Sequence, residues 1–401
     1  MNNKSKNKGV YLDNAATTAV DPRVLKAMLP YFTKQFGNAS SLHYYGRDAL
    51  NAVDLAREKI ASFLNAKTLE IYFTSCGSES DNWALRGRVY APSKNKNKHI
   101  ITTSIEHPAV LDTCRVLEKE GVKVDYLGVD HDGYVSLDDV KRVATPETTL
   151  ISIMMANNEI GSIQPIAEIG EFSKELGVCF HTDAVQAAES EDLNVNNLNV
   201  DLLSLSAHKF HGPKGIGILY IRSGVELSRL ITGGHQERNQ RAGTTNTPLI
   251  IGMASALEIA VNERAEYISR LIPLRNYFID RVLKEIPFCN LNGGLDRRLP
   301  NNINLSFDFI ESESILISLD RAGIAVSSGS ACSAASLEPS HVIIALGVGA
   351  EKAHSSLRVS LGRTTTIEEL DYTIYVLKRE IERLRGISPL FNVEKGVGSY
   401  V

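Results

Sequence analysis

A lysine and an aspartate that each follow an apolar stretch could together do chemistry. Lys209 comes shortly after the apolar run 200–205, and Asp183 ends the run 178–183. Pyridoxal phosphate needs a lysine for its Schiff base and an acid that keeps its ring nitrogen protonated, so that the ring becomes an electron sink. The pair therefore points to a pyridoxal phosphate site more strongly than either residue alone.

Strands that alternate with short helices must position these residues. The strands are expected at 71–74, 98–103, 122–127, 150–155, 178–182, 200–205 and 215–221, and the helices at 80–89, 108–120, 136–144 and 166–176. This alternation predicts an α/β fold with a mostly parallel sheet that is covered on both faces. Ligands of such sheets bind beyond the carboxyl ends of the strands. Five polar residues follow predicted strands and should share one site: Ser78, His107, Asn158, Asp183 and Lys209.

Composition narrows the class of protein. The 401 residues include 43% hydrophobic and 22% charged side chains and carry a net charge of -4, so neither nucleic acid nor a membrane is expected as a partner. No apolar run approaches the ~20 residues that span a bilayer. The five cysteines are odd in number and lack a Cys-x-x-Cys pair, which argues against a disulfide framework or zinc site. We expect a cytoplasmic protein.

The segment Thr74–Ser80 joins a strand to a helix start. Backbone N–H groups at a helix N-terminus bind phosphate, with Gly77 permitting close approach and Ser78 adding a hydroxyl. Simple helix capping is the alternative for such a segment. The run Gly212–Gly217 lacks the order of a nucleotide-binding loop and leads into a strand, so it reads as a turn. His208 and His211 have no evident third ligand, and no metal is expected.

Three further residues have both a structural and a chemical interpretation. His107 is either a cap or an imidazole that stacks on the cofactor and moves protons. Cys332 lies in a run of small residues and is either incidental or a thiol that attacks sulfur. Arg358 either forms an ion pair or binds a substrate carboxylate through its fork.

Taken together, the motifs resemble the cysteine desulfurases of the NifS/IscS type, within the fold-type I pyridoxal phosphate enzymes. The resemblance runs from about Tyr11 to Pro389. It rests on these segments: 11–18, 36–38, 74–82, 106–108, 157–161, 181–186, 206–209, 241–244, 327–336 and Arg358.

The resemblance implies roles for residues of this chain. Lys209 would form the Schiff base, and Asp183 would hold the ring nitrogen. The other cofactor contacts implied are Gln186, His107 and Asn158 at the ring, Gly77, Ser78, Ser206 and His208 at the phosphate, and Thr244 from the second subunit of a homodimer. The substrate carboxylate would meet Arg358 and Asn14.

The resemblance also implies a reaction. Lys209 would remove the α-proton of L-cysteine, and Cys332 would attack the substrate sulfur and keep it as a persulfide. Alanine would leave, and an iron–sulfur scaffold protein would accept the sulfur. Cys332 is also a candidate for transient ligation of a cluster in that partner complex. A selenocysteine lyase or another enzyme of this fold, and a non-enzymatic assembly platform, are the alternatives.

With this fold we expect three parts. Residues 1–15 form an N-terminal segment that joins the small domain, 16–262 a large cofactor-binding domain, and 263–401 a small α+β domain that carries the cysteine loop at about 327–336. A helix over 248–272 should hold the boundary and be followed by a separate helix over 273–286. A capping box at Thr366–Glu369 should open a long terminal helix. The sequence motifs leave the nitrogen-fixation and housekeeping branches unresolved.

Overall fold

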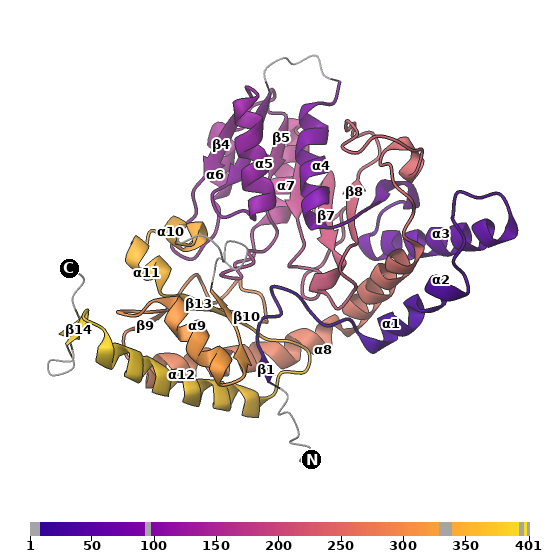
Figure 1. Ribbon diagram of the computed structural model, residues 1–401. Coiled ribbons are helices and arrows are strands. Elements are labelled where there is room, and N and C mark those ends of the chain that lie inside the picture. Colours follow the sequence, from indigo (N-terminus) through magenta and orange to yellow (C-terminus); the bar gives the residue numbers. More distant parts are fainter. Residues whose placement is uncertain (1–8, 93–97, 329–338, 393–396, 399–401) are drawn as a thin grey trace, which may run out of the picture.

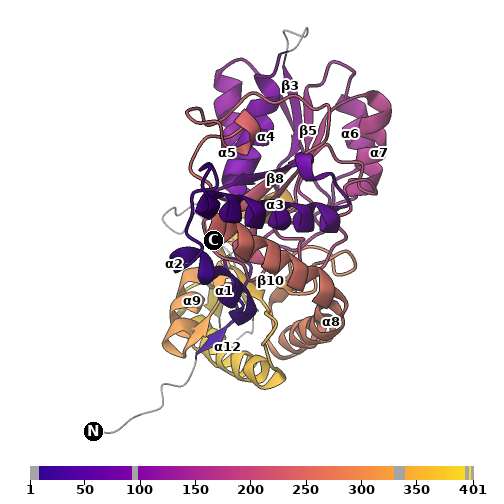
Figure 2. The same ribbon diagram turned by 90° about the vertical axis from the view of Figure 1, so that its right-hand side faces the viewer.

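The computed structural model describes residues 9–92, 98–328, 339–392 and 397–398. A seven-stranded sheet with its helices forms the upper part of Figure 1, and a four-stranded sheet with α9 (Ser312–Arg321), α12 (Ile367–Ile387) and neighbouring helices forms the lower part. Figure 2 shows the same two parts joined by the long helix α8. Cys332 lies outside the described residues.

The large sheet is mostly parallel, as predicted. Strand β8 runs antiparallel to both of its neighbours, and the remaining strands share one direction. The order across the sheet is β2 (Ile71–Thr74), β8 (Gly217–Ile221), β7 (Leu202–Ser206), β6 (Phe180–Asp183), β5 (Leu150–Ser152), β3 (His99–Thr103) and β4 (Lys123–Leu127). β5 is shorter than predicted, although the N–H groups of Ile153 and Met155 still donate to carbonyls of β6.

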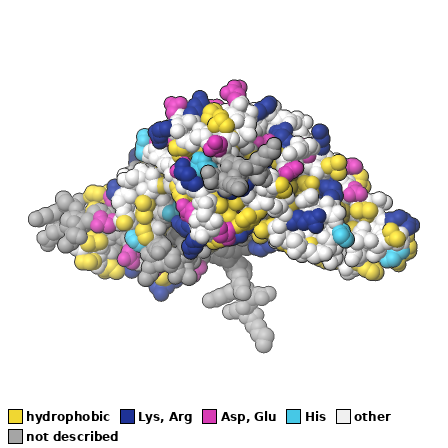
Figure 3. Space-filling view, turned by 90° about the horizontal axis from the view of Figure 1, so that it is seen from above, with side chains coloured by type: hydrophobic (Ala, Val, Ile, Leu, Met, Phe, Trp, Pro, Cys, Tyr) yellow, Lys and Arg dark blue, Asp and Glu magenta, His cyan; other side chains and the backbone are white. Residues whose placement is uncertain are grey.

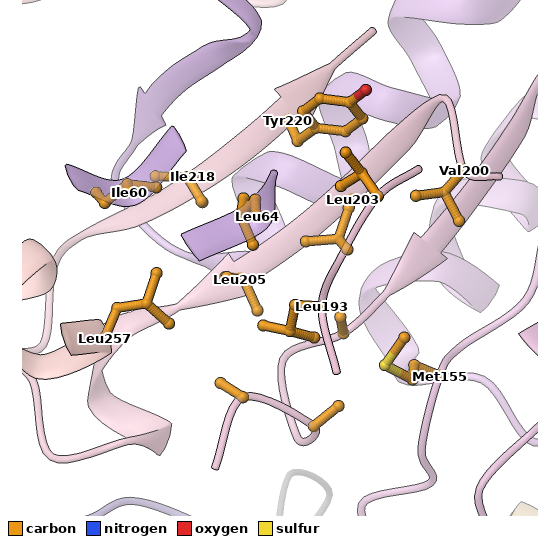
Figure 4. Packing of buried hydrophobic residues seen from close by; sticks show 14 of the residues in the cluster. Ile60, Leu64, Met155, Leu193, Val200, Leu203, Leu205, Ile218, Tyr220 and Leu257 are labelled. Carbon is orange, nitrogen blue, oxygen red and sulfur yellow. The ribbon is translucent and has the colours of Figure 1, made fainter. Parts of the chain in front are cut away.

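Both faces of this sheet are buried, which explains why its strands are apolar at nearly every position. Leu202 and Leu219 face one core, whereas Leu203 and Tyr220 face the other. Figure 4 shows the second of these cores, in which Leu203, Leu205 and Ile218 lie near Leu64 and Leu257. The covering helices are α3 (Tyr44–Leu64), α4 (Gly77–Val89), α5 (Pro108–Lys119), α6 (Leu137–Val143) and α7 (Ile166–Leu176).

The predicted boundary helices are wrong in one respect. A single helix, α8 (Thr247–Glu285), replaces the two that were expected, and Pro273 lies inside it. A proline removes one backbone hydrogen bond from a helix interior. The helix continues because apolar side chains anchor both halves: Leu257 packs in the core of the large sheet and Phe278 in that of the small sheet.

The small sheet is antiparallel, in the order β12 (Ser327–Ser328), β13 (Ser356–Ser360), β10 (Asn302–Phe307) and β9 (Cys289–Leu291). Its core includes side chains of α9 (Ser312–Arg321) and α12 (Ile367–Ile387), and Thr366 caps α12 with the predicted capping box. Near the N-terminus, β1 (Val10–Tyr11) pairs with β11 (Ile324–Ala325). The other elements are α1 (Pro22–Met28), α2 (Pro30–Thr33), α10 (His341–Ala345), α11 (Ala350–His354), β14 (Phe391–Asn392) and β15 (Val397–Gly398).

None of the helices in the described residues is long and apolar enough to cross a bilayer.

Candidate active site

Lys209 lies directly after β7, in the 3-10 turn Ala207–Lys209. Its Nζ donates to the carbonyl oxygens of Ala15 and Ala16 at 2.6 and 2.9 Å. The amide of Gln186 donates to the same Ala15 carbonyl at 3.0 Å. The lysine is therefore held over the carboxyl end of the large sheet by a segment that is distant in sequence.

Asp183 ends β6 beside this turn and is 6% exposed. One carboxylate oxygen accepts the backbone N–H of Val185 at 2.9 Å. Burial raises the pKa of Asp183 to about 6, although the Val185 N–H and the Lys209 charge act to lower it. Above pH 6 the carboxylate is a buried negative charge close enough to Lys209 to feel its field. An ionised acid in this place suits a protonated ring nitrogen.

The turn between β2 and α4 forms a cradle for an anion. Helix α4 begins at Gly77, three residues earlier than the predicted start at residue 80, and no side chain caps it at Cys76. The first N–H groups of the helix, including that of Ser78, thus remain for a ligand. A methyl group at Gly77 would lie 2.9 Å from Cγ2 of Val185 and 3.4 Å from Cβ of Ser206. Glycine leaves this space open.

Glu79 braces the cradle. It accepts two hydrogen bonds from Arg241, at 2.7 and 2.9 Å, and one from the backbone N–H of Ser75 at 2.7 Å. Burial acts to raise the pKa of Glu79, but the bonds from Arg241 and Ser75 outweigh it and hold the pKa below its ordinary value. Sequence inspection did not single out this brace, because the two charges are far apart in the chain.

His107 caps α5 and stands on the same side of the sheet. Its Nδ1 accepts the N–H of Ala109 at 3.1 Å, so the cap interpretation of this residue is correct as far as it goes. Burial, and next the charge of Lys209, lower the pKa of His107 to about 4. A neutral imidazole that feels the lysine can also exchange protons in the site, so capping and chemistry are compatible.

Arg358 reaches the site from the small sheet. It lies within β13, and its guanidinium donates to the carbonyl of Asn158 and to the carboxylate of Asp13, both at 3.0 Å. The residue is 2% exposed, and its Nε has no partner among the described residues. The two bonds described use two of the five N–H donors of the guanidinium, so donors remain for a small carboxylate.

The segment 13–18 joins these groups. Asp13 pairs with Arg358, and Asn14 donates to the Ser360 carbonyl at 2.9 Å. The hydroxyl of Thr17 lies 3.1 Å from Nδ1 of His208, whose pKa burial lowers to about 4, with the charges of Lys209 and Lys214 adding to the effect. Asn14 and His208 thus contact the protein itself here. Asp13 and the carbonyls of Ala15 and Ala16 escaped the sequence analysis, since a backbone acceptor leaves no residue-type signal.

Of the remaining predicted residues, two lie at the site and one lies at a separate exposed cavity. Ser206 borders the cradle, and Asn158 contributes its carbonyl to Arg358. Thr244 is exposed and lines a cavity of about 200 Å³ with Thr74 and Ser75 of the same chain.

Pyridoxal phosphate fits the donor set of this site. An amine, a buried carboxylate and an open helix N-terminus meet the needs of its aldehyde, its ring nitrogen and its phosphate respectively. The four described cysteines are free, and within the described residues no group of three or more His, Cys, Asp or Glu is arranged to hold a metal.

Comparisons with known proteins agree with this geometry. Residues 10–373 match the family model of class-V aminotransferases. A "Cysteine desulfurase IscS" of Clostridium botulinum is 53% identical over 387 residues, which cover 96% of this chain and 97% of that protein. A relative with the same name in Dictyoglomus turgidum is 54% identical over 95% of this chain and 96% of that protein.

Among solved structures, a "NifS-like protein" superposes with a TM-score of 0.88 and 39% identity, covering 94% of this chain and all of that one. The chain thus belongs to the class-V aminotransferases and, within them, to the cysteine desulfurases of the NifS/IscS type, which depend on pyridoxal phosphate.

Proposed function

We propose that this family member transfers the sulfur of L-cysteine to the thiol of Cys332 and releases L-alanine. In this reaction the carbon–sulfur bond of the substrate breaks and a sulfur–sulfur bond forms on the enzyme. One enzyme thiol and one L-cysteine thus give one enzyme persulfide and one L-alanine, with no hydrogen or electron gained or lost. The single observation that carries the proposal is that the segment 13–18 contacts both Lys209, whose charge acts on Asp183, and the buried Arg358 of the other sheet.

Residues of this chain would hold the cofactor as follows. The N–H groups of Gly77 and Ser78, with Ser206 and His208, would bind its phosphate. Asp183 would face the ring nitrogen, while Gln186, Asn158 and His107 would contact the ring. Bound pyridoxal phosphate supplies an electron sink for the α-carbon of the substrate.

The substrate would be oriented by its charges. The guanidinium of Arg358 would receive the carboxylate, with Asn14 beside it. Lys209 removes the α-proton and returns it, because its Nζ is held over the site by the Ala15 and Ala16 carbonyls. His107 is neutral above pH 4, so it adds no charge to the site until it accepts a proton.

Similar proteins support the choice of substrate. One solved relative, described as "SspA in complex with cysteine", has a TM-score of 0.78 and is 39% identical over 88% of this chain and 98% of that one. The name IscS of the curated relatives, with the resemblance described above, supports an iron–sulfur scaffold protein as sulfur acceptor and a cytoplasmic location.

A homodimer completes the proposal, with Thr244 reaching the partner's cofactor. Large apolar side chains are exposed along α1, α2 and the start of α3, including Leu29 at 54%, Phe36 at 63% and Leu42 at 91%. Figure 3 shows yellow side chains at the right-hand end, where these helices lie in Figure 1. Several exposed apolar side chains on these helices and on the connections between them favour a second copy. Sedimentation equilibrium should give twice the chain mass, and a monomer would contradict this part.

Product analysis tests the reaction. The cofactor-loaded protein with L-cysteine and a thiol reductant should give equal amounts of alanine and sulfide. Pyruvate and ammonia would instead indicate β-elimination and overturn the proposal.

Replacing the nucleophile tests the role of the thiol. Cys332→Ser should abolish persulfide formation and sulfur transfer, whereas Cys289→Ser, a matched change at a half-buried thiol, should leave both unchanged. A selenocysteine lyase, which needs no loop thiol, would keep its activity in the Cys332→Ser variant.

A further inference from the structure

A second buried carboxyl group lies behind Asp183. Asp81, in α4, is 1% exposed, and its Oδ1 has no hydrogen-bond partner in the described part of the chain. It faces the side of the sheet on which Asp183 and His181 also stand, and Oδ1 lies 3.7 Å from Nε2 of His181. Helix packing against a sheet normally buries apolar side chains, so an acid at this place needs a physical account.

A chain of hydrogen bonds crosses three neighbouring strands at this point. His181 in β6 contacts the hydroxyl of Ser152 in β5 through Nδ1, at 2.9 Å, and that of Ser204 in β7 through Nε2, at 3.0 Å. All three residues are fully buried. Ser204 also interacts with Asp81, so the chain runs from Ser152 through His181 and Ser204 to Asp81.

The direction of this chain depends on the charge of Asp81. An ionised Asp81 would accept the Ser204 hydroxyl proton, which forces a proton onto Nε2 of His181 and leaves Nδ1 to accept from Ser152. A protonated Asp81 would donate to Ser204, Ser204 would donate to Nε2, and Nδ1 would carry the imidazole proton. Each protonation state therefore fixes one tautomer of His181.

Electrostatics decides between the two states. Two ionised carboxylates in one buried place repel each other, and one of them takes up a proton. Burial and the neighbouring Asp183 charge raise the pKa of Asp81 well above its ordinary value, although the interaction with Ser204 acts to lower it. Burial lowers the pKa of His181 to about 3, so no imidazolium compensates. Asp183 has the Val185 N–H and Lys209 to stabilise its charge, and Asp81 has neither.

From this arrangement we infer that Asp81 is a protonated positioning residue. Asp81, Ser204 and His181 are then all neutral. Asp183 is therefore the one charged group that this cluster presents to the ring nitrogen of the cofactor. The inference rests on the proposed role of Asp183. It goes beyond that role because it assigns the protonation state of Asp81 and the tautomer of His181.

Infrared and NMR spectroscopy test the protonation state of Asp81 and the tautomer of His181 without any turnover of substrate. At pH 7.5 the infrared spectrum of the holoenzyme should contain the carbonyl stretch of a protonated carboxyl group that disappears in Asp81→Asn and persists in Glu106→Gln. Nitrogen-15 shifts of labelled wild type should place the His181 proton on Nδ1, a result that needs no variant. An Nε2–H tautomer, or the lack of an Asp81-dependent band, would overturn the inference.

Cofactor affinity gives a third readout. Asp81→Asn, which replaces one neutral group by another of the same shape, should bind pyridoxal phosphate within about twofold of wild type. Removing a real charge beside the ring would change that affinity by tenfold or more, which corresponds to about 1.4 kcal/mol. A tenfold change in Asp81→Asn would therefore contradict a protonated Asp81. Weak binding by Asp183→Asn, with Asp81→Asn normal, supports the inference, whereas normal binding by Asp183→Asn refutes the proposed role of Asp183 instead.

Discussion

The two sheets hold their polar groups in different ways. The large sheet presents Asp183 at the last position of β6 and Lys209 in the turn that follows β7. The small sheet presents Arg358 from the middle of β13, with Asn304 on one side and Ser327 on the other. A side chain at the end of a strand can be replaced with little effect on the sheet. The position of an arginine in the middle of a strand is set by the strands on both sides of it. We therefore expect the large sheet to govern the cofactor and the small sheet to govern the substrate.

The largest effect should come from Lys209→Ala. Loss of the residue that takes the α-proton should lower alanine formation by about 10³-fold or more, since a positioned acid–base group contributes about 10²–10⁴-fold and this lysine has a second role at the cofactor. Alanine release and the absorption spectrum of the cofactor are the measurements. Lys214→Ala, at a nearby exposed lysine, is the control and should retain activity.

Arg358→Ala should separate the two sheets. We expect kcat/KM for L-cysteine to fall about 10²-fold, mostly through KM, because a charge-assisted carboxylate contact is worth about 1.5–3 kcal/mol. Pyridoxal phosphate affinity should stay the same, and Arg383→Ala on the exposed face of α12 should change neither quantity. A parallel loss of cofactor affinity in Arg358→Ala would break the division between the sheets.

Gly77→Ala probes the cradle on the large sheet. Its new methyl group would meet Val185 at 2.9 Å, so the turn must shift and the affinity for pyridoxal phosphate should fall about tenfold, or ~1.4 kcal/mol. Equilibrium dialysis measures this loss. Gly386→Ala in α12, where nothing lies within 4 Å, serves as the control and should leave cofactor affinity unchanged.

The last prediction concerns pH and stability and leaves the site chemistry unchanged. Burial raises the pKa of Glu106 to about 8, despite hydrogen bonds from the Met154 N–H and the Thr103 hydroxyl. Its neutral form stabilises the fold fully below pH 4.5, and this contribution is lost as the pH rises to about 8, because the unfolded chain ionises first. Urea unfolding at pH 5.5 and 8.0 should show a loss in wild type that is about 3 kcal/mol larger than in Glu106→Gln. Equal losses would show that Glu106 is ionised in the fold.

Much of this arrangement was predictable from the sequence. Alternating apolar strands and helices predicted the mostly parallel sheet, and the positions of Asp183, His107 and Lys209 after strands predicted that they would meet. The continuous helix α8 was not predicted, because a proline is a strong local signal for a break while the two cores that hold the helix together are set by tertiary packing.

The partners of the site residues were harder to predict. Backbone acceptors such as the Ala15 carbonyl, and long-range pairs such as Asp13 with Arg358 and Glu79 with Arg241, depend on how distant segments come together. Asp81 was missed for a different reason: inside a helix, an acid that faces a sheet has the same local sequence signal as one that faces water.

The segment 13–18 also has a consequence for how the protein is made. A ribosome releases this segment long before β11 and Arg358, yet Asp13 pairs with Arg358 and β1 pairs with β11. Contacts of such long sequence separation form late, because the intervening chain must be closed first. Domains fold as they emerge, at about 5–20 residues per second. The large sheet can therefore assemble on the ribosome before the segment 13–18 has its partners in the small sheet, and a segment that is made early is fixed in place late.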